Sequence, residues 1–226
     1  MLRMKLVILE RLFIIFFILM IQPPPSFSSD EMPSQEIIGA AQEGIRTFLK
    51  VPRRQNLHKL GFLSQKAIDE AVLGEGFRIF TLPPDRLLST DPPQDIDSLV
   101  LPTNMWQFLI VTEGKATALL TVDLVKNRWT AVSIGGSGLA AQLEILLETW
   151  PASAGYRYRL IKVYQAKSDL IEILQGGKII GLVPFTSARI ATGLEKRDFN
   201  PLDLHDPAEM IEKLRPIVRM NIQTDR

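Results

Sequence analysis

The chain of 226 residues is nearly neutral, with 26 lysines and arginines against 25 aspartates and glutamates, and it contains no cysteine. Without cysteine there can be no disulfide, no cysteine-linked lipid and no cysteine-ligated metal. Without a surplus of positive charge there is little to release counterions from a nucleic acid, so we expect no nucleic-acid partner.

The first 28 residues have the layout of a secretory signal peptide. A basic start leads into an unbroken apolar run, Leu12–Ile21, and three prolines follow it. Ser26 and Ser28 supply the small residues expected at the −3 and −1 positions of a cleavage site before Ser29. The sequence therefore predicts a secreted or periplasmic protein. Cleavage would leave 198 residues with a net charge of −1, because the signal carries three basic residues and one acidic residue.

An uncleaved membrane anchor is the alternative to cleavage. A spanning helix needs about 20 apolar residues, and extending the apolar run backwards would include Glu10 and Arg11. Each charge near the bilayer centre costs about 2.5–3.5 kcal/mol on insertion scales. Release is therefore favoured, and contact with a membrane is expected only if the segment stays attached.

Two helices are expected in the segment 29–75. Apolar residues recur at spacings of three and four over Ile37–Leu49, which predicts a helix with one buried face. A second helix is predicted over 64–73, with Ser64 as its N-cap and Gly74 at its end.

Residues 76–226 are expected to form an α+β domain, in one globular unit with 29–75. Alternating apolar and polar residues, separated by turn signals at 113–115, 126–128 and 175–178, predict a mainly antiparallel sheet of about six to seven strands. The expected strands are 77–82, 105–111, 116–122, 129–134, 156–164, 170–174 and 179–185. A turn is expected at 83–85 and an exposed connection at 91–98, because both are rich in proline and aspartate.

One internal helix is expected to pack on this sheet, and terminal helices are expected to flank it. The internal helix follows the glycine-rich loop 135–138 and carries a leucine stripe, Leu139, Leu143, Leu146 and Leu147. The last helix is predicted over 207–218, kinked or ended early by Pro216.

The glycine-rich loop has the spacing of a dinucleotide-binding motif when read from Gly136 to Ala141, and it lies between a predicted strand and a helix. Gly136, Ser137 and Gly138 are therefore candidate ligands for a phosphate or another anion. However, the surrounding strands look antiparallel, and no acidic residue lies about 20 residues downstream to bind a ribose. The favoured interpretation is a strand-to-helix turn with Ser137 as the helix cap.

The same loop could present a serine nucleophile. Ser137 would need a base, and only His58 and His205 are available; Asp203 or Asp169 could complete the set. The G-x-S-x-G pattern of a nucleophile elbow fails at its last position. Ser137, Asp203 and His205 therefore remain weak catalytic candidates, and the sequence favours a non-enzymatic protein.

Two tyrosines and two arginines alternate over residues 156–159. In a strand this places Arg157 and Arg159 on one face, where they could bind a carboxylate or phosphate group. The alternative is an exposed strand face whose arginines pair with neighbouring carboxylates. No metal site is expected, because Asp95 and Asp97 lack the glycine and closing glutamate of an EF-hand loop. No cofactor is expected either.

These patterns favour a non-catalytic exported domain that binds another exported or envelope protein, or a small anionic ligand. The alternative is a hydrolase or phosphate-ligand-binding protein that uses the 135–138 loop. A third hypothesis is a regulatory interaction module in which Ile37–Leu49 is a docking helix.

Overall fold

The computed structural model describes residues 32–49, 60–62, 64–89, 96–194 and 199–224. Seven strands form one sheet in the order β4-β3-β2-β1-β5-β6-β7. The strands are β1 (Val72–Thr81), β2 (Leu101–Thr112), β3 (Lys115–Val125), β4 (Arg128–Gly135), β5 (Tyr156–Val163), β6 (Ser168–Gln175) and β7 (Lys178–Pro184). Neighbouring strands are antiparallel except β1 and β5, which are parallel. The predicted α+β class with a mainly antiparallel sheet is confirmed.

Seven α-helices are described, and several of them separate strands along the chain. They are α2 (Gln35–Leu49), α3 (Gln65–Asp69), α4 (Pro84–Ser89), α5 (Ile96–Leu99), α6 (Ser137–Thr149), α7 (Thr186–Thr192) and α8 (Pro207–Thr224), with short 3-10 turns η3 (Ala152–Ala154) and η4 (Tyr164–Ala166). No helix in the described ranges is long and apolar enough to cross a membrane.

Tight turns join the strands of the three hairpins β2–β3, β3–β4 and β6–β7. Each turn has two residues with positive φ: Glu113 and Gly114, Lys126 and Asn127, Gly176 and Gly177. Two such residues in a row match the right-handed twist of the flanking strands. The hairpin turns predicted at 113–115, 126–128 and 175–178 are therefore confirmed.

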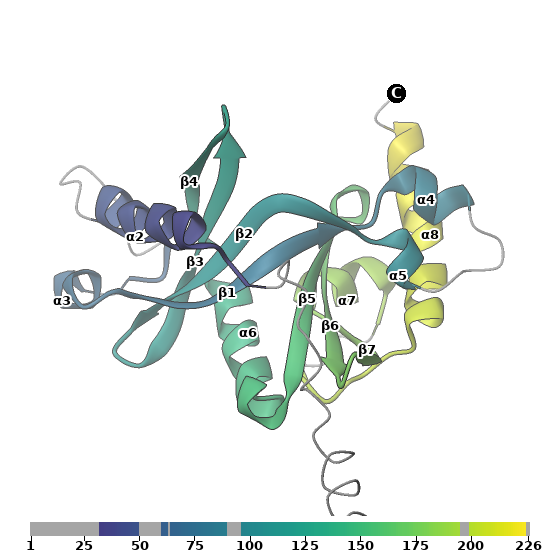
Figure 1. Ribbon diagram of the computed structural model, residues 1–226. Coiled ribbons are helices and arrows are strands. Elements are labelled where there is room, and N and C mark those ends of the chain that lie inside the picture. Colours follow the sequence, from purple (N-terminus) through teal and green to yellow (C-terminus); the bar gives the residue numbers. More distant parts are fainter. Residues whose placement is uncertain (1–31, 50–59, 63, 90–95, 195–198, 225–226) are drawn as a thin grey trace, which may run out of the picture.

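The sheet buries apolar side chains on both faces. On one face, α6 shares a buried cluster with side chains of six strands, β4 excepted, among them Ile79, Leu160 and Ile171. On the other face, α2 and α3 cover β2 to β4, whereas α4, α5 and α8 cover β5 to β7. Figure 1 shows α2 and α8 toward opposite ends of the sheet.

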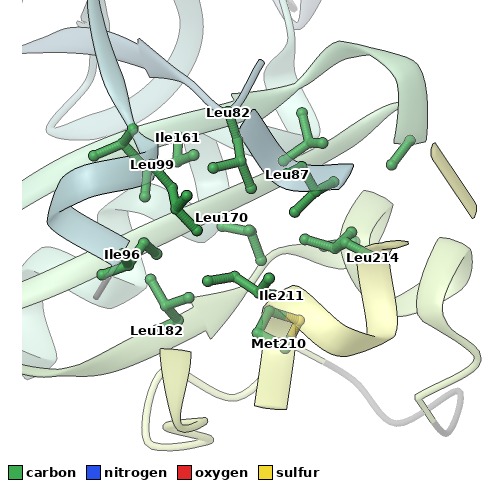
Figure 2. Close-up of a cluster of buried hydrophobic side chains, with 14 of the residues drawn as sticks. Leu82, Leu87, Ile96, Leu99, Ile161, Leu170, Leu182, Met210, Ile211 and Leu214 are labelled. Atoms are coloured by element: carbon green, nitrogen blue, oxygen red, sulfur yellow. The ribbon is translucent and has the colours of Figure 1, made fainter. Parts of the chain in front are cut away.

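The C-terminal helix α8 closes the core over β5 to β7. Met210, Ile211 and Leu214 are buried on α8 and face Leu87 of α4 and Leu170 of β6 (Figure 2). Val218, beyond the proline at position 216, is buried in the same cluster, so the helix continues to Thr224 although proline removes one main-chain hydrogen bond. The prediction that Pro216 could end the helix early is wrong.

Other boundaries also differ from expectation. The helix capped by Ser64, whose hydroxyl accepts a hydrogen bond from Ala67 N, ends at Asp69. Gly74 therefore does not end a helix but lies within β1, where a Cβ would come 2.9 Å from the Val111 side chain. The close approach of the Val111 side chain thus requires a residue without a side chain at position 74, which explains the glycine inside β1.

Three short helices replace segments expected to be irregular. The expected turn at 83–85 begins α4, and α7 follows β7 directly where only a strand end was expected. The segment predicted as an exposed connection, 91–98, overlaps α5, in which Ile96 and Leu99 are buried, while 90–95 lie outside the described residues. Tertiary burial of a few apolar side chains holds these short helices, which would not be stable alone.

The helix α2 packs closely on the sheet through its glycine at position 44. Ile37, Ala41, Ile45 and Leu49 form its buried face. A Cβ added at Gly44 would overlap the Cβ of the alanine at position 131 in β4. The apolar face of Ile37–Leu49 thus covers the sheet of its own chain, which leaves it unavailable as the docking surface considered above.

Paired glycine substitutions in α2 test this packing. At Gly39 nothing lies within 4 Å of an added Cβ, so Gly39→Ala should stabilise the protein by about 0.5–1 kcal/mol through helix propensity. Gly44→Ala has the same propensity gain but must displace β4, which costs about 1–3 kcal/mol. In urea unfolding, the free energy of unfolding of Gly44→Ala should therefore be lower than that of Gly39→Ala by about 1–3 kcal/mol. Equal stabilities would contradict the close contact between α2 and β4.

Candidate functional site

The glycine-rich loop joins β4 to α6. Gly136 is the N-cap of α6 with φ +69°, and no side chain caps the helix; Ser137 is its first residue. The prediction that Ser137 is the cap is therefore wrong, because the left-handed residue at the helix start is the glycine before it. Nothing lies within 4 Å of a Cβ added at Gly138.

The sheet around this loop differs from that of a dinucleotide-binding unit. That unit needs two parallel strands joined by the helix. Here β4 pairs antiparallel with β3, and β5, the strand after α6, lies four places away in the sheet. Gly136 and Gly138 are exposed and Ser137 is half-buried. Their role as anion ligands stays a prediction without support from strand topology.

Ser137 and His205 lie at different parts of the molecule. The Cβ of Ser137 lies 3.1 Å from the Cβ position of Gly61, which also contacts Thr117 of β3. His205 forms a main-chain bridge with Leu182 of β7, the last strand at the other side of the sheet. Within the described residues no hydrogen bond joins the Ser137 hydroxyl to His205, and His58 lies outside them. The geometry offers Ser137 no described base.

His205 instead belongs to an ionic cluster with Asp203 and Arg189. The His205 Nε2 atom lies 3.4 Å from one carboxylate oxygen of Asp203, and the buried Arg189 of α7 donates to the other. The hydrogen bond from Arg189 holds the pKa of Asp203 below its usual value of 3.8, and His205 adds to the effect. The cluster fastens the chain before α8 onto α7 and β7.

A second polar cluster lies where α7 meets β6. Asp169 pairs with Lys162 at 2.5 Å, and its second oxygen accepts a hydrogen bond of 3.0 Å from the Ser187 hydroxyl. The Ser187 oxygen in turn accepts the Asp169 main-chain N–H at 2.9 Å. Both polar functions of the hydroxyl are thus used to hold the start of α7, so Asp169 acts here as an anchor.

The two arginines of β5 have different surroundings. Arg159 donates to Glu172, which is fully buried, and to Asp97, and it lies over the Phe80 ring at 5.7 Å. Both carboxylates raise the pKa of Arg159 against the opposing effect of its burial. Arg157 donates to main-chain carbonyl oxygens, including that of Tyr156 at 2.7 Å. The described contacts of Arg159 correspond to the expected alternative of pairing with neighbouring carboxylates.

An open groove runs between α2 and the edge strand β4. It consists of two adjoining hollows, of about 400 and about 610 Å³, which share Ala40, Arg128 and Trp129. The first extends along α2 to Glu43 and beyond, and the second extends to Glu36 near the β3–β4 turn. We call this surface the α2–β4 groove. It combines a half-buried indole with charges of both signs.

The two edge strands of the sheet, β4 and β7, differ in whether another segment pairs with their outer side. The outer side of β7 is partly occupied, because Leu182 and His205 exchange main-chain hydrogen bonds of 3.0 and 2.8 Å. Beyond β4 no further strand pairs in the described part of the chain. Val132 of β4 is 42% exposed. An unpaired edge strand presents main-chain donors and acceptors to another chain.

Sequence reasoning did not identify this groove. Arg128 belongs to the turn predicted at 126–128, and Trp129 begins the strand predicted over 129–134. The alternation over 129–134 predicted a strand, but sheet order decides whether that strand is at an edge, and no local pattern encodes sheet order. The described residues contain no group of three or more metal-binding side chains that could hold an ion.

Comparison with known proteins adds no constraint on the site. No family model, no curated protein and no solved structure matches this chain.

The Asp203 cluster should make stability depend on acid pH. Because the pKa of Asp203 is depressed in the folded state, its contribution is present above pH 3.8 and is lost as the pH falls further. We expect Asp203→Asn to lower the stability at pH 7 by about 1 kcal/mol, a small value because the carboxylate is partly exposed. This corresponds to about 2–4 °C in Tm.

Thermal unfolding at pH 7 and pH 3 checks this expectation. The difference in Tm between the protein and Asp203→Asn should shrink at the lower pH. Glu113→Gln removes a carboxylate from a turn and serves as the control, with little expected change at either pH. A difference that stays constant with pH would contradict an ionic role for Asp203.

Proposed function

We propose that this protein is exported and acts outside the cytoplasm as a non-catalytic binding domain. Its partner is a protein that docks along the β4 edge and the α2–β4 groove. The observation that carries the proposal is the coincidence of an unpaired edge strand with a groove along the same strand.

Main-chain hydrogen bonds and side-chain pockets together support recognition of an extended segment. In strand addition, the unpaired main chain of an edge strand supplies affinity, and pockets for alternate side chains supply specificity. β4 offers both, because its Trp129 lines the two hollows beside α2. An aromatic side chain in a hollow is the kind of group that dominates interface energetics.

The candidate catalytic residues give less support to an enzyme. Ser137 is separated from His205, and the Asp203 carboxylate is engaged by Arg189. A nucleophile needs a base within hydrogen-bond reach. A binding function requires no such arrangement and uses a surface that the described residues provide.

The proposal of export depends on the amino-terminal sequence, and the position of the mature amino terminus tests it. We expect intact-mass spectrometry of the protein recovered from its producing cells to place the mature amino terminus at Ser29, because small residues occupy the −3 and −1 positions. Ser28→Arg places a large charged residue at −1 and should leave the segment attached. A mature protein that begins at Met1 would contradict the proposed export.

Docking at β4 is tested by photo-crosslinking from two equally exposed edge positions. A benzophenone amino acid is placed at Val132 of β4 or at Ile180 of β7, which are 42% and 41% exposed. In producing cells we expect an adduct from position 132 only, because the β7 edge is already bridged to His205 at Leu182, two residues from Ile180. Ala40→Phe, which fills the shared part of the groove, should remove the adduct.

Other outcomes would contradict the proposed docking site. Equal adducts from positions 132 and 180 would indicate nonspecific proximity. An adduct that persists in Ala40→Phe would place the partner away from the groove.

A further inference from the structure

We propose that the segment docked at the β4 edge is an amphipathic strand, with its apolar side toward α2 and its polar side toward solvent. One large apolar side chain of this segment lies in the α2–β4 groove between Ala40 and Trp129. The inference rests on the proposed function, because it names the chemistry of the partner at the same surface. The apolar middle of the groove, between two ends of mixed charge, carries it.

The stretch of β4 available for regular pairing is short. It begins at Arg128, directly after the β3–β4 turn. In the register with β3, the paired residues pass from Ala131 to Ser133, so Val132 is left over as a bulge. A bulge bends a strand and interrupts its ladder. An uninterrupted run of four residues, 128 to 131, therefore remains for a docked segment, and all four line the groove.

Alternate residues of this run point to opposite faces of the sheet. Trp129 and Ala131 pack against the apolar cluster that α2 covers, so the side chains of Arg128 and Thr130 start from the other face. In a paired strand, the residue directly opposite each position lies on the same face as its partner. A docked segment therefore places the residues opposite 129 and 131 beside α2, and its other residues on the far face.

The α2 side of the run accepts a large apolar side chain beside Trp129. The two hollows, of about 400 and about 610 Å³, share the short side chain of Ala40, and Leu124 borders the second. The half-buried indole of Trp129 offers an aromatic surface there. Contact of this ring with another aromatic or aliphatic side chain is favourable because it removes apolar area from water. The residue opposite 129 is therefore the anchor of the docked segment.

Charge does not decide which segment binds. Glu36 and Arg128 line the same hollow at one end of the groove, and Glu43 lies 3.4 Å from Arg46 at the other end. A carboxylate and a cation thus occur at both ends. A charged side chain placed between them would meet attractive and repulsive groups while losing hydration, which is costly. An uncharged anchor is therefore favoured over an anchor of either sign.

The far face of the segment requires polar residues. Among the described residues, the apolar cluster under α6 contains no side chain of β4, and Arg128 and Thr130 make that face of the strand polar. A docked segment beside them stays in contact with water on this side. Its sequence therefore alternates polar and apolar residues, which is the pattern of a strand with one buried face.

Disulfide capture of short peptides tests the anchor. The chain has no cysteine, so Val132→Cys introduces a single thiol beside the pairing run. The probe is the peptide Cys-Ala-Thr-Xaa-Thr, which places Xaa opposite position 129 in an antiparallel pair when its cysteine bonds to position 132. The reversed sequence does the same in a parallel pair. Equilibration with reduced and oxidised glutathione gives the constant for the mixed disulfide, which rises when the peptide also binds noncovalently.

This constant should depend on the size and polarity of Xaa. With phenylalanine or leucine it should be about tenfold higher than with alanine, because a large apolar side chain is removed from water. With glutamate or lysine it should not exceed the alanine value, and the two charged peptides should be alike. Intact-mass spectrometry measures the fraction of the protein that carries each peptide.

Two variants control the measurement. Ile180→Cys places the thiol on β7 at a site of matched exposure, 41% against 42% for Val132, and should show no preference among the peptides. Ala40→Phe, added to the Val132→Cys protein, fills the shared part of the groove and should remove the preference for phenylalanine. Glutathione without peptide reports the intrinsic reactivity of each thiol.

Contrary results distinguish this inference from the proposed function. Equal constants for all peptides, or a preference that persists in Ala40→Phe, overturn the apolar anchor, whereas an adduct from position 132 in producing cells still supports docking at β4. A constant that is highest with glutamate or with lysine overturns the selection of an uncharged anchor. The absence of both the apolar preference and the adduct in cells overturns both proposals.

Discussion

The seven-stranded sheet depends on the parallel pairing of β1 with β5. This seam consists of only three residue pairs, from Ile79 with Leu160 to Thr81 with Lys162. Every other pairing is antiparallel, and the hairpins among them are local in sequence. The seam joins residues about 80 positions apart and thereby unites β1 to β4 with β5 to β7. Its formation carries the largest loop-closure cost in the sheet.

Side chains around the seam compensate for its short length. The Thr81 hydroxyl donates to the Lys162 carbonyl oxygen across it. Arg159, on β5, donates to Glu172 of β6 and to Asp97 of α5, and its guanidinium lies over Phe80 of β1. One cation thus connects two strands and a helix on the face that α4, α5 and α8 cover. Removing either carboxylate would leave charge poorly compensated in a partly buried place.

Local chemistry explains which parts of the fold were predictable. The turns at Gly114, Asn127 and Gly177 could be located because positive φ at these positions has a strong sequence signature. The α2 helix was located by the spacing of its apolar residues. By contrast, α5 and α7 have no periodicity to detect in four and seven residues, and burial against α8 and β6 makes them helical.

The candidate site was less predictable than the fold for a physical reason. Arg159 could be placed on a strand face from alternation, but its carboxylates come from another strand and from a helix 62 residues away. The α2–β4 groove likewise joins elements whose contact depends on sheet order. Ser137 is of a residue type preferred at helix N-caps. Gly136 nevertheless occupies the N-cap of α6, because glycine tolerates a left-handed backbone.

The bridge at β7 makes the two edges of the sheet different. A sheet with two open edges can add strands at both ends and grow into a filament, which is the geometry of fibrous aggregation. Here His205 pairs with Leu182 through its own main chain and covers part of the β7 edge, whereas no strand pairs beyond β4 in the described part of the chain. One short bridge in the connection before α8 thus obstructs the open-ended polymerisation that two bare edges would permit.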